Sequence, residues 1–283
     1  MVSAEPRIEV LADAEATSRA AATAIATALA DAVARRGRAE WATTGGSTPV
    51  GIYRELAVAP LRDEVPWQSV NVWWGDDRYV PRDHPLSNVL PLDQVLLSAT
   101  AHAGLSGTGE YGVDVERHTE PGVPLPVANI HAPRMSDAIA SGGGPEWVAT
   151  EYADRLRDAG LPAASDGFPI LDLVLVGVGP DGHVMSVFPG SPLFDATAWV
   201  SAVPAPTHIE PHVPRISFHP RLLEAARLPI VVAHGAAKAE VMASVFGGER
   251  DVRRWPAQLA RREGAVWFLD RAAAASLAPS LLG

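Results

Sequence analysis

The sequence predicts an α/β fold with a doubly wound, mainly parallel Rossmann-like sheet and helices on both faces. Segments of strand character alternate with segments of helical periodicity, which is typical of a parallel sheet joined by right-handed crossovers. The segment 171–176 is almost continuously aliphatic, as expected for a strand that is covered on both faces. Polar, glycine-containing loops follow three of the expected strands, and such sheets bind ligands beyond the carboxyl ends of their strands.

The individual elements follow from local patterns. Helical periodicity extends over residues 13–36 and stops at Gly37, and Pro49 suits the first turn of a short helix. The strands are expected at 39–43, 70–74, 171–176, 229–233 and 265–269, and the remaining helices at 88–97, 146–159, 236–246 and 271–277. The composition is loop-like near 101–126 and 203–214, so we expect a single α/β domain over 1–283 with irregular insertions there.

Composition limits the class of protein. With 47% hydrophobic and 20% charged residues, the chain of 283 residues is typical of a soluble globular protein, and no apolar run is long enough to cross a bilayer. The net charge of −10 argues against nucleic acid or an anionic membrane as a partner. The absence of cysteine and of a basic apolar start favours the cytoplasm, and the oligomeric state stays open between a monomer and a small homo-oligomer.

The first polar loop, 44–49, has the features of a phosphate-binding loop. Gly45 and Gly46 leave backbone N–H groups accessible, and a helix N-terminus follows. Ser47 and Thr48 add hydroxyl donors. The spacing fits neither a Walker loop nor a dinucleotide fingerprint. The alternative is an ordinary strand-to-helix turn in which Ser or Thr caps the helix.

The second polar loop, 75–81, follows the next strand and carries Asp76, Asp77 and Arg78, with Asn88 shortly after it. The guanidinium of Arg78 is suited to bidentate binding of a phosphate or a carboxylate. The two aspartates are suited to orienting other groups. In the alternative interpretation these charges only form salt bridges with one another.

The third polar loop, 177–190, follows the aliphatic strand and carries Asp181 and His183, two titratable groups two residues apart. Its glycines, Gly179 among them, break regular structure and let a ligand approach the backbone. A histidine beyond the carboxyl end of such a strand is a candidate general base. The alternative is a solvated histidine in an ordinary turn.

Two further cations, Arg215 and Lys238, are expected at the same edge of the sheet. Lys238 falls in the first turn of a predicted helix, where a cation opposes the helix dipole. A role in ligand binding is therefore favoured over a role in helix stability. The alternative for both residues is an ordinary surface cation.

His208 and His212 imitate a metal-binding pair at i, i+4. Pro211 lies between them and breaks the helix that would bring both imidazoles onto one face. We therefore expect no metal site there.

Several motifs in one order carry a resemblance to a known family. They are 44–49, 75–81 with Ser87 and Asn88, 177–190, 214–217, 235–238 and 264–273. Together they resemble the 6-phosphogluconolactonase family, within the glucosamine/galactosamine-6-phosphate isomerase superfamily, over nearly the whole chain. Two departures are visible: Asp77 stands where the family usually has Glu, and 184–188 replaces Thr-Ala-Ser-Leu-Phe.

The resemblance implies hydrolysis of 6-phospho-D-glucono-1,5-lactone to 6-phospho-D-gluconate in the oxidative pentose phosphate pathway, with no metal or organic cofactor. A lactone needs an activated water and a proton for the departing ring oxygen, and His183 is expected to serve as base and then as acid. Asp181, or a carboxylate of the pair Asp76 and Asp77, would fix the tautomer of His183. The substrate-binding residues are expected to be Gly45, Gly46, Ser47, Thr48, Asp77, Arg78, Asn88, Gly179, Arg215 and Lys238.

Two other functions stay open. A glucosamine-6-phosphate deaminase or isomerase has a similar histidine loop, but there the histidine is followed by Phe-Asn-Glu-Pro, whereas 184–192 contains no carboxylate. A non-catalytic sugar-phosphate-binding protein is the second alternative. The roughly forty residues before the first polar loop leave no room for an attached DNA-binding module of the kind that sugar-phosphate-sensing regulators carry.

Overall fold

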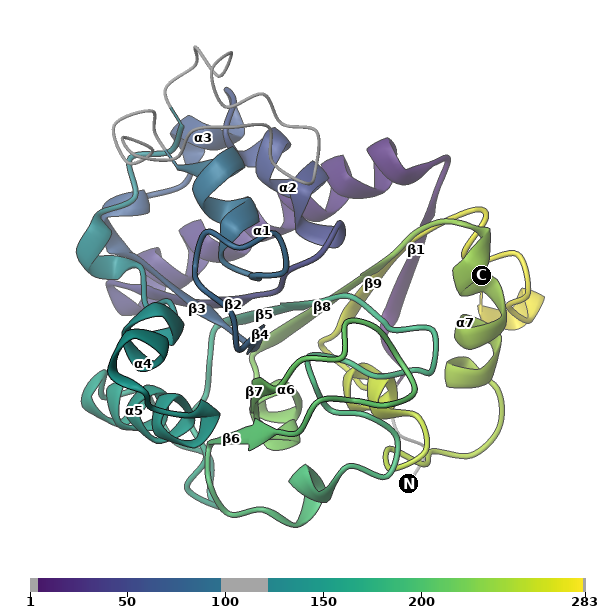
Figure 1. Cartoon of the computed structure of the whole chain (residues 1–283). Coiled ribbons are helices and arrows are strands. Elements are labelled where there is room, and N and C mark those ends of the chain that lie inside the picture. Colours follow the sequence, from purple (N-terminus) through teal and green to yellow (C-terminus); the bar gives the residue numbers. More distant parts are fainter. Residues whose placement is uncertain (1–4, 98–121, 282–283) are drawn as a thin grey trace.

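The computed structural model describes residues 5–97 and 122–281, and its centre is a six-stranded parallel sheet (Figure 1). The strand order is β1-β9-β8-β5-β2-β3. The strands are β1 (Arg7–Leu11), β2 (Ala39–Thr43), β3 (Val70–Trp74), β5 (Leu173–Val176), β8 (Leu228–Ala233) and β9 (Val266–Asp270). All of their pairings are parallel, so the predicted doubly wound, mainly parallel α/β fold is confirmed.

The strand β5 lies in the middle of the sheet, between β2 and β8. All of its residues are buried. Leu173 and Leu175 belong to the core on one face of the sheet, whereas Val174 and Val176 belong to the core on the other. This alternation explains why the strand is aliphatic throughout.

Two groups of helices cover the two faces of the sheet. One group contains α1 (Ala14–Arg36), α2 (Thr48–Leu56) and the short α3 (Leu61–Glu64). The other contains α4 (Met135–Ser141), α5 (Pro145–Asp158), α6 (Pro220–Ala225) and α7 (Ala239–Phe246). Figure 1 shows α1 and α2 on one side of the sheet and α4 and α5 on the other. Within the described ranges, no helix has both the length and the apolar character needed to cross a membrane.

The helix α1 begins and ends where the sequence indicates. The carboxylate of Asp13 accepts the backbone N–H of Ala16 at 2.8 Å and so caps the first turn. Gly37 ends the helix with a φ of 78°, in the left-handed region that favours glycine.

A small antiparallel sheet, in the order β4-β7-β6, continues from the end of β3. Its strands are β4 (Asp76–Arg78), β6 (Val200–Val203) and β7 (Arg215–Phe218). The segment 75–81, which the sequence predicts to be a loop, is therefore partly a strand. Three residues are too few to produce a periodic pattern, and the partner of β4 is far away in the sequence.

Two of the predicted helices are wrong in part or in full. Residues 271–277 form turns and a bend instead of the expected helix. Within 88–97 the element is the π-helix Leu92–Leu96. The predicted helix 236–246 begins later than expected, because 236–238 form a 3-10 turn and α7 starts at Ala239. Lys238 ends this turn and so does not lie inside the first turn of the helix, where the sequence predicts it.

One of the two expected irregular insertions can be described. Residues 204–214, here called the 204–214 loop, contain no helix or strand and lead directly into β7. The expectation for 101–126 falls mostly on residues 98–121, outside the described residues.

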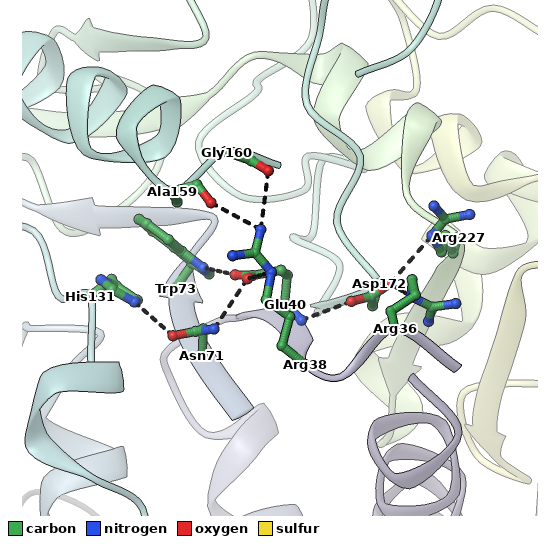
Figure 2. A network of polar contacts seen from close by, with 10 residues as sticks. All are labelled: Arg36, Arg38, Glu40, Asn71, Trp73, His131, Ala159, Gly160, Asp172 and Arg227. Carbon is green, nitrogen blue, oxygen red and sulfur yellow. Dashed lines mark hydrogen bonds and ion pairs between the residues drawn. The ribbon is translucent and has the colours of Figure 1, made fainter. Parts of the chain in front are cut away.

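A polar network joins the amino ends of β2, β3 and β5 (Figure 2). Glu40 accepts Nε1–H of Trp73 at 2.7 Å and Nδ2–H of Asn71 at 3.1 Å. Asp172 accepts the backbone N–H of Glu40 at 2.9 Å and pairs with Arg36 at 2.9 Å. Burial raises the pKa of Glu40, although its hydrogen bonds oppose the rise. The network ties the strands together at the edge opposite the polar loops.

Candidate active site

The loops after β2, β3 and β5 meet at the carboxyl edge of the sheet and surround a cavity of about 400 Å³. The cavity is lined by Thr44, Gly45, Thr48, Asp76, Arg78, Asn88, Gly177, Val178, Gly179, Pro180, His183, Met185, Ile209, Glu210 and Arg215. All three polar loops contribute, together with β7 and the 204–214 loop. The cavity therefore brings His183 together with two of the expected cations.

His183 is oriented by Asp181. Its Nδ1 lies 2.5 Å from Oδ1 of Asp181, and its backbone N–H donates to the same oxygen at 3.2 Å. Burial raises the pKa of Asp181, but the hydrogen bonds and the charge of His183 outweigh burial, so the pKa lies below its usual range. An ionised carboxylate can only accept. Nδ1 of His183 therefore carries a proton, and Nε2 is the nitrogen that bears the lone pair in the neutral form of the ring.

Gly179 leaves space for the ring of His183. A Cβ atom on Gly179 would lie 2.0 Å from Nδ1 of His183, far inside contact distance. The backbone N–H of Gly179 also donates to the carbonyl of His183 at 2.9 Å, which closes the loop. The ring of His183 therefore requires a glycine at position 179, whether or not a ligand also approaches the backbone there.

Arg78 and Arg215 supply two guanidinium groups without a carboxylate partner among the described residues. Arg78 donates to the carbonyl of Leu86 at 2.9 Å, and Arg215 donates to the carbonyl of Pro211 at 3.0 Å. The Nε atoms of both arginines are buried without a partner. Arg215 is only 2% exposed, and burial lowers its pKa. Free N–H groups on a buried cation are suited to binding an anion.

Asp76 is held by Ser186 and Asn88. Its carboxylate accepts the hydroxyl of Ser186 at 2.6 Å and Nδ2–H of Asn88 at 3.1 Å. Of the carboxylates considered for orienting His183, the one that contacts the ring is Asp181.

Asn88 presents an unpaired acceptor in the lining of the cavity. Its Nδ2 donates to the backbone carbonyl of Asp76 at 2.8 Å, while its Oδ1 is buried without a partner. A Cβ atom on Gly45 would lie 2.0 Å from this oxygen. The oxygen is therefore suited to accept a hydrogen bond from a ligand hydroxyl.

Asp77 lies behind the cavity and is not part of its lining. Its carboxylate accepts the backbone N–H groups of Arg78 at 2.8 Å and of Asn88 at 2.7 Å. Burial raises the pKa of Asp77 to about 7, although these two hydrogen bonds lower it. Asp77 thus holds two residues of the lining in place, and the contact with substrate expected for it has no support in this geometry.

Gly46, Ser47 and Lys238 also lie outside the lining of this cavity. Ser47 lines a neighbouring cavity of about 620 Å³ beside α1. Nζ of Lys238 donates to the carbonyl of Val178 at 2.7 Å, and Val178 is a lining residue. Burial lowers the pKa of Lys238, while the charge of Asp181 opposes this. Contact of these residues with a phosphate stays a prediction.

Seven lining residues were not selected individually from the sequence: Thr44, Gly177, Val178, Pro180, Met185, Ile209 and Glu210. The first five of them belong to the polar loops 44–49 and 177–190. Ile209 and Glu210 belong to the 204–214 loop, where the spacing of His208 and His212 gives no indication of them. Met185 lies two residues after His183 and has a φ of 54°, which is uncommon for a residue other than glycine. Its place inside a recognised motif was the available signal.

The imidazole rings of His208 and His212 contact different residues. Nε2 of His208 lies 3.1 Å from Oδ2 of Asp181, and Nδ1 of His212 lies 2.7 Å from the carbonyl oxygen of Pro206. In the part of the chain that the structure describes, no three side chains of His, Asp or Glu are grouped as metal ligands.

Comparison with known proteins confirms the resemblance. A family model for glucosamine-6-phosphate isomerases/6-phosphogluconolactonase matches residues 12–268. The 6-phosphogluconolactonase of Streptomyces coelicolor is 33% identical over 99% of this chain and 98% of its own. The 6-phosphogluconolactonase of Synechocystis is 30% identical over 97% of this chain and 99% of its own.

Solved structures agree with these relatives. The 6-phosphogluconolactonase of Trypanosoma brucei superposes with a TM-score of 0.75 at 26% identity and covers 97% of this chain and 99% of its own. A monomeric glucosamine-6-phosphate deaminase shares the fold, with a TM-score of 0.68 at 16% identity over 95% of this chain and 99% of its own. The chain thus belongs to the family of glucosamine-6-phosphate isomerases and 6-phosphogluconolactonases.

Proposed function

We propose that the protein hydrolyses 6-phospho-D-glucono-1,5-lactone to 6-phospho-D-gluconate in the oxidative pentose phosphate pathway. The proposal is carried by the pair His183 and Asp181, beside a cavity lined by two guanidinium groups whose Nε atoms have no hydrogen-bond partner. A general base and an anion site in one cavity match the two ends of this substrate, a lactone carbonyl and a phosphate. The relatives named 6-phosphogluconolactonase support the same substrate.

His183 acts as general base and then as general acid. Its Nε2 takes a proton from a water molecule as the water oxygen forms a bond to the lactone carbonyl carbon. The bond between that carbon and the ring oxygen then breaks, and Nε2 returns the proton to the departing oxygen. Asp181 holds Nδ1–H throughout and stabilises the imidazolium formed between the two steps. This route needs no metal or organic cofactor.

The 6-phosphate binds to Arg78 and Arg215. Both guanidinium groups line the cavity and keep N–H donors that no described residue uses. The 44–49 loop precedes α2, so its backbone N–H groups and the helix dipole add to the attraction. Binding at a distance from C1 orients the carbonyl toward the water and His183.

Opening of an amino-sugar ring has less support. No Asp or Glu occurs in 184–192, where the isomerase branch has its acid. Glu210 lines the cavity from the 204–214 loop, so a carboxylate is nevertheless present at the cavity. A direct assay of both reactions therefore has to decide between them.

The test follows acid release from fresh 6-phospho-D-glucono-1,5-lactone against its spontaneous hydrolysis, with His183→Ala as the matched control. We expect strong acceleration by the wild-type protein and almost none by the variant, with the same circular dichroism spectrum for both. Unphosphorylated glucono-1,5-lactone should be a much poorer substrate, because it cannot use the two arginines. Acceleration that does not depend on His183 would reject the mechanism, and ammonia release from glucosamine 6-phosphate would support the isomerase activity instead.

A further inference from the structure

Asp181 binds a second imidazole besides that of His183. Its Oδ1 lies 2.5 Å from Nδ1 of His183, and its Oδ2 lies 3.1 Å from Nε2 of His208. The ring of Phe188 packs against both histidines, with centroid distances of 4.8 Å to His183 and 5.4 Å to His208. One carboxylate and one aromatic ring therefore connect the proposed base with the 204–214 loop.

We propose that His208 is a positioning residue for catalysis, which orients Asp181 and moderates its negative charge and thereby controls the orientation and protonation of His183. The inference rests on the proposed lactonase function, in which His183 is the base. It assigns a role to a residue that does not line the cavity and that lies outside the motifs of the family resemblance.

The hydrogen bonds of Asp181 explain why its orientation depends on His208. The terminal torsion of an aspartate is broad, so one bonded oxygen does not fix the plane of the carboxylate. Oδ1 accepts both Nδ1–H and the backbone N–H of His183, whereas the only donor to Oδ2 among the described residues is His208. Loss of His208 would leave Oδ2 without a donor and the carboxylate free to turn.

The same contact controls the charge that His183 experiences. A carboxylate with donors on both oxygens attracts a proton on His183 less strongly than a carboxylate with one free oxygen. When His208 is itself protonated, it places a positive charge on the other side of the same carboxylate and disfavours a second proton on His183. The side chain of His208 is 52% exposed and that of His183 only 16%, so His208 is the more solvent-exposed of the two imidazoles on Asp181.

The other charged groups near this pair stay constant in the test. Arg215 from β7 and Lys238 from the turn before α7 both interact with the charge of Asp181. Asp76, Arg78 and Glu210 line the cavity that His183 faces. Because these groups are unchanged in variants of His208, a difference in pH profile between such variants arises from position 208.

The experiment compares the wild type with His208→Ala, His208→Gln and the loop control His212→Ala. We expect His208→Ala to lower kcat about tenfold, which is the smaller end of the loss found when the partner that orients a metal-binding histidine is removed, with KM changed less than about twofold. The acid limb of kcat/KM should move to higher pH, because the freed carboxylate favours protonated His183. His208→Gln keeps an N–H donor for Oδ2 and should return both kcat and the acid limb most of the way toward wild type.

The control His212→Ala removes a contact inside the same loop, to the carbonyl of Pro206, without touching Asp181. It should keep the wild-type acid limb. If His208→Ala leaves both kcat and the acid limb of the kcat/KM profile unchanged, the proposal is overturned. It is also overturned if His212→Ala shifts the acid limb as much as His208→Ala does, because a change in the fold of the loop would then explain the effect.

A second readout does not depend on activity. The Nδ1–H proton of His183, followed by NMR without substrate, should change its resonance in His208→Ala and not in His212→Ala. An unmoved resonance overturns the proposal. Failure of the lactonase function itself would be seen separately, as a wild-type protein that does not accelerate lactone hydrolysis.

Discussion

Arg78 of β4 is the direct register partner of Arg215 in β7. Like charges in opposite positions destabilise an antiparallel pair by up to about 1 kcal/mol, and the Nε atoms of both side chains are buried without a partner. The strand pairing nevertheless holds the two guanidinium groups side by side at the cavity. A bound anion would supply the missing negative charge, so this pairing connects the small sheet to the recognition of phosphate.

Replacement of Arg78 or Arg215 by Met keeps apolar bulk and removes the charge. We expect KM for the phosphorylated lactone to rise roughly ten- to hundredfold with a smaller change in kcat, because a charge-assisted hydrogen bond contributes about 1.5 to 3 kcal/mol. Steady-state kinetics measures both constants. The control is Arg253→Met, which removes an exposed ion pair with Asp195. A fall in kcat at constant KM would mean that the arginines act on the reacting atoms and not on the phosphate.

Replacement of His183 by Asn removes the proposed base while keeping a polar side chain. A positioned general base contributes about 10² to 10⁴-fold, so kcat should fall by that order with little change in stability. Asp181→Asn should also lower kcat, because the amide no longer requires Nδ1 to carry the proton. Single-turnover rates at saturating lactone measure the effect. Wild-type rates in Asp181→Asn would show that His183 does not need this partner.

Asp77 should make the protein more stable in mild acid than at alkaline pH. Burial raises the pKa of this carboxyl from 3.8 to about 7, so the folded state binds the proton more tightly than the unfolded state. The contribution to stability is present below about pH 4 and is lost as pH rises to about 7. The measurement is the free energy of unfolding by chemical denaturation, near pH 5 and near pH 8. The difference between these two values should be smaller in Asp77→Asn than in the wild type. An equal pH dependence in both proteins would contradict this.

His131 should have the opposite effect. Burial lowers its pKa from 6.5 to about 4, with a smaller contribution from Arg155, so the unfolded state binds the proton more tightly. The contribution of neutral His131 to stability is therefore lost as pH falls from about 6.5 to about 4. His131→Phe keeps a ring to stack on Trp73, 4.0 Å away in the native pair. Chemical denaturation near pH 7 and near pH 4 measures how much unfolding free energy each protein loses in acid. The loss should be smaller in His131→Phe than in the wild type by about 1 to 2 kcal/mol, after allowance for solvent screening.

Most of the parallel sheet was predictable, because its signals are local. The strand β5 is a short apolar run that ends at a turn before Gly177, and its boundaries follow from residues that are adjacent in the sequence. The small sheet was not predictable. The pairing of Asp76–Arg78 with Arg215–Phe218 depends on two short segments that meet only when the parallel sheet has formed.

Local patterns in the sequence were sufficient to predict the α/β class, the three polar segments at one edge of the sheet, and His183 as the group around which chemistry is expected. Tertiary structure alone decided that Asp181 and not Asp76 contacts His183, that Arg78 faces Arg215, and that His208 reaches the same carboxylate. The reason is physical: periodicity and turn chemistry act between neighbours in the chain, whereas a hydrogen bond requires atoms of distant segments to meet within about 3 Å.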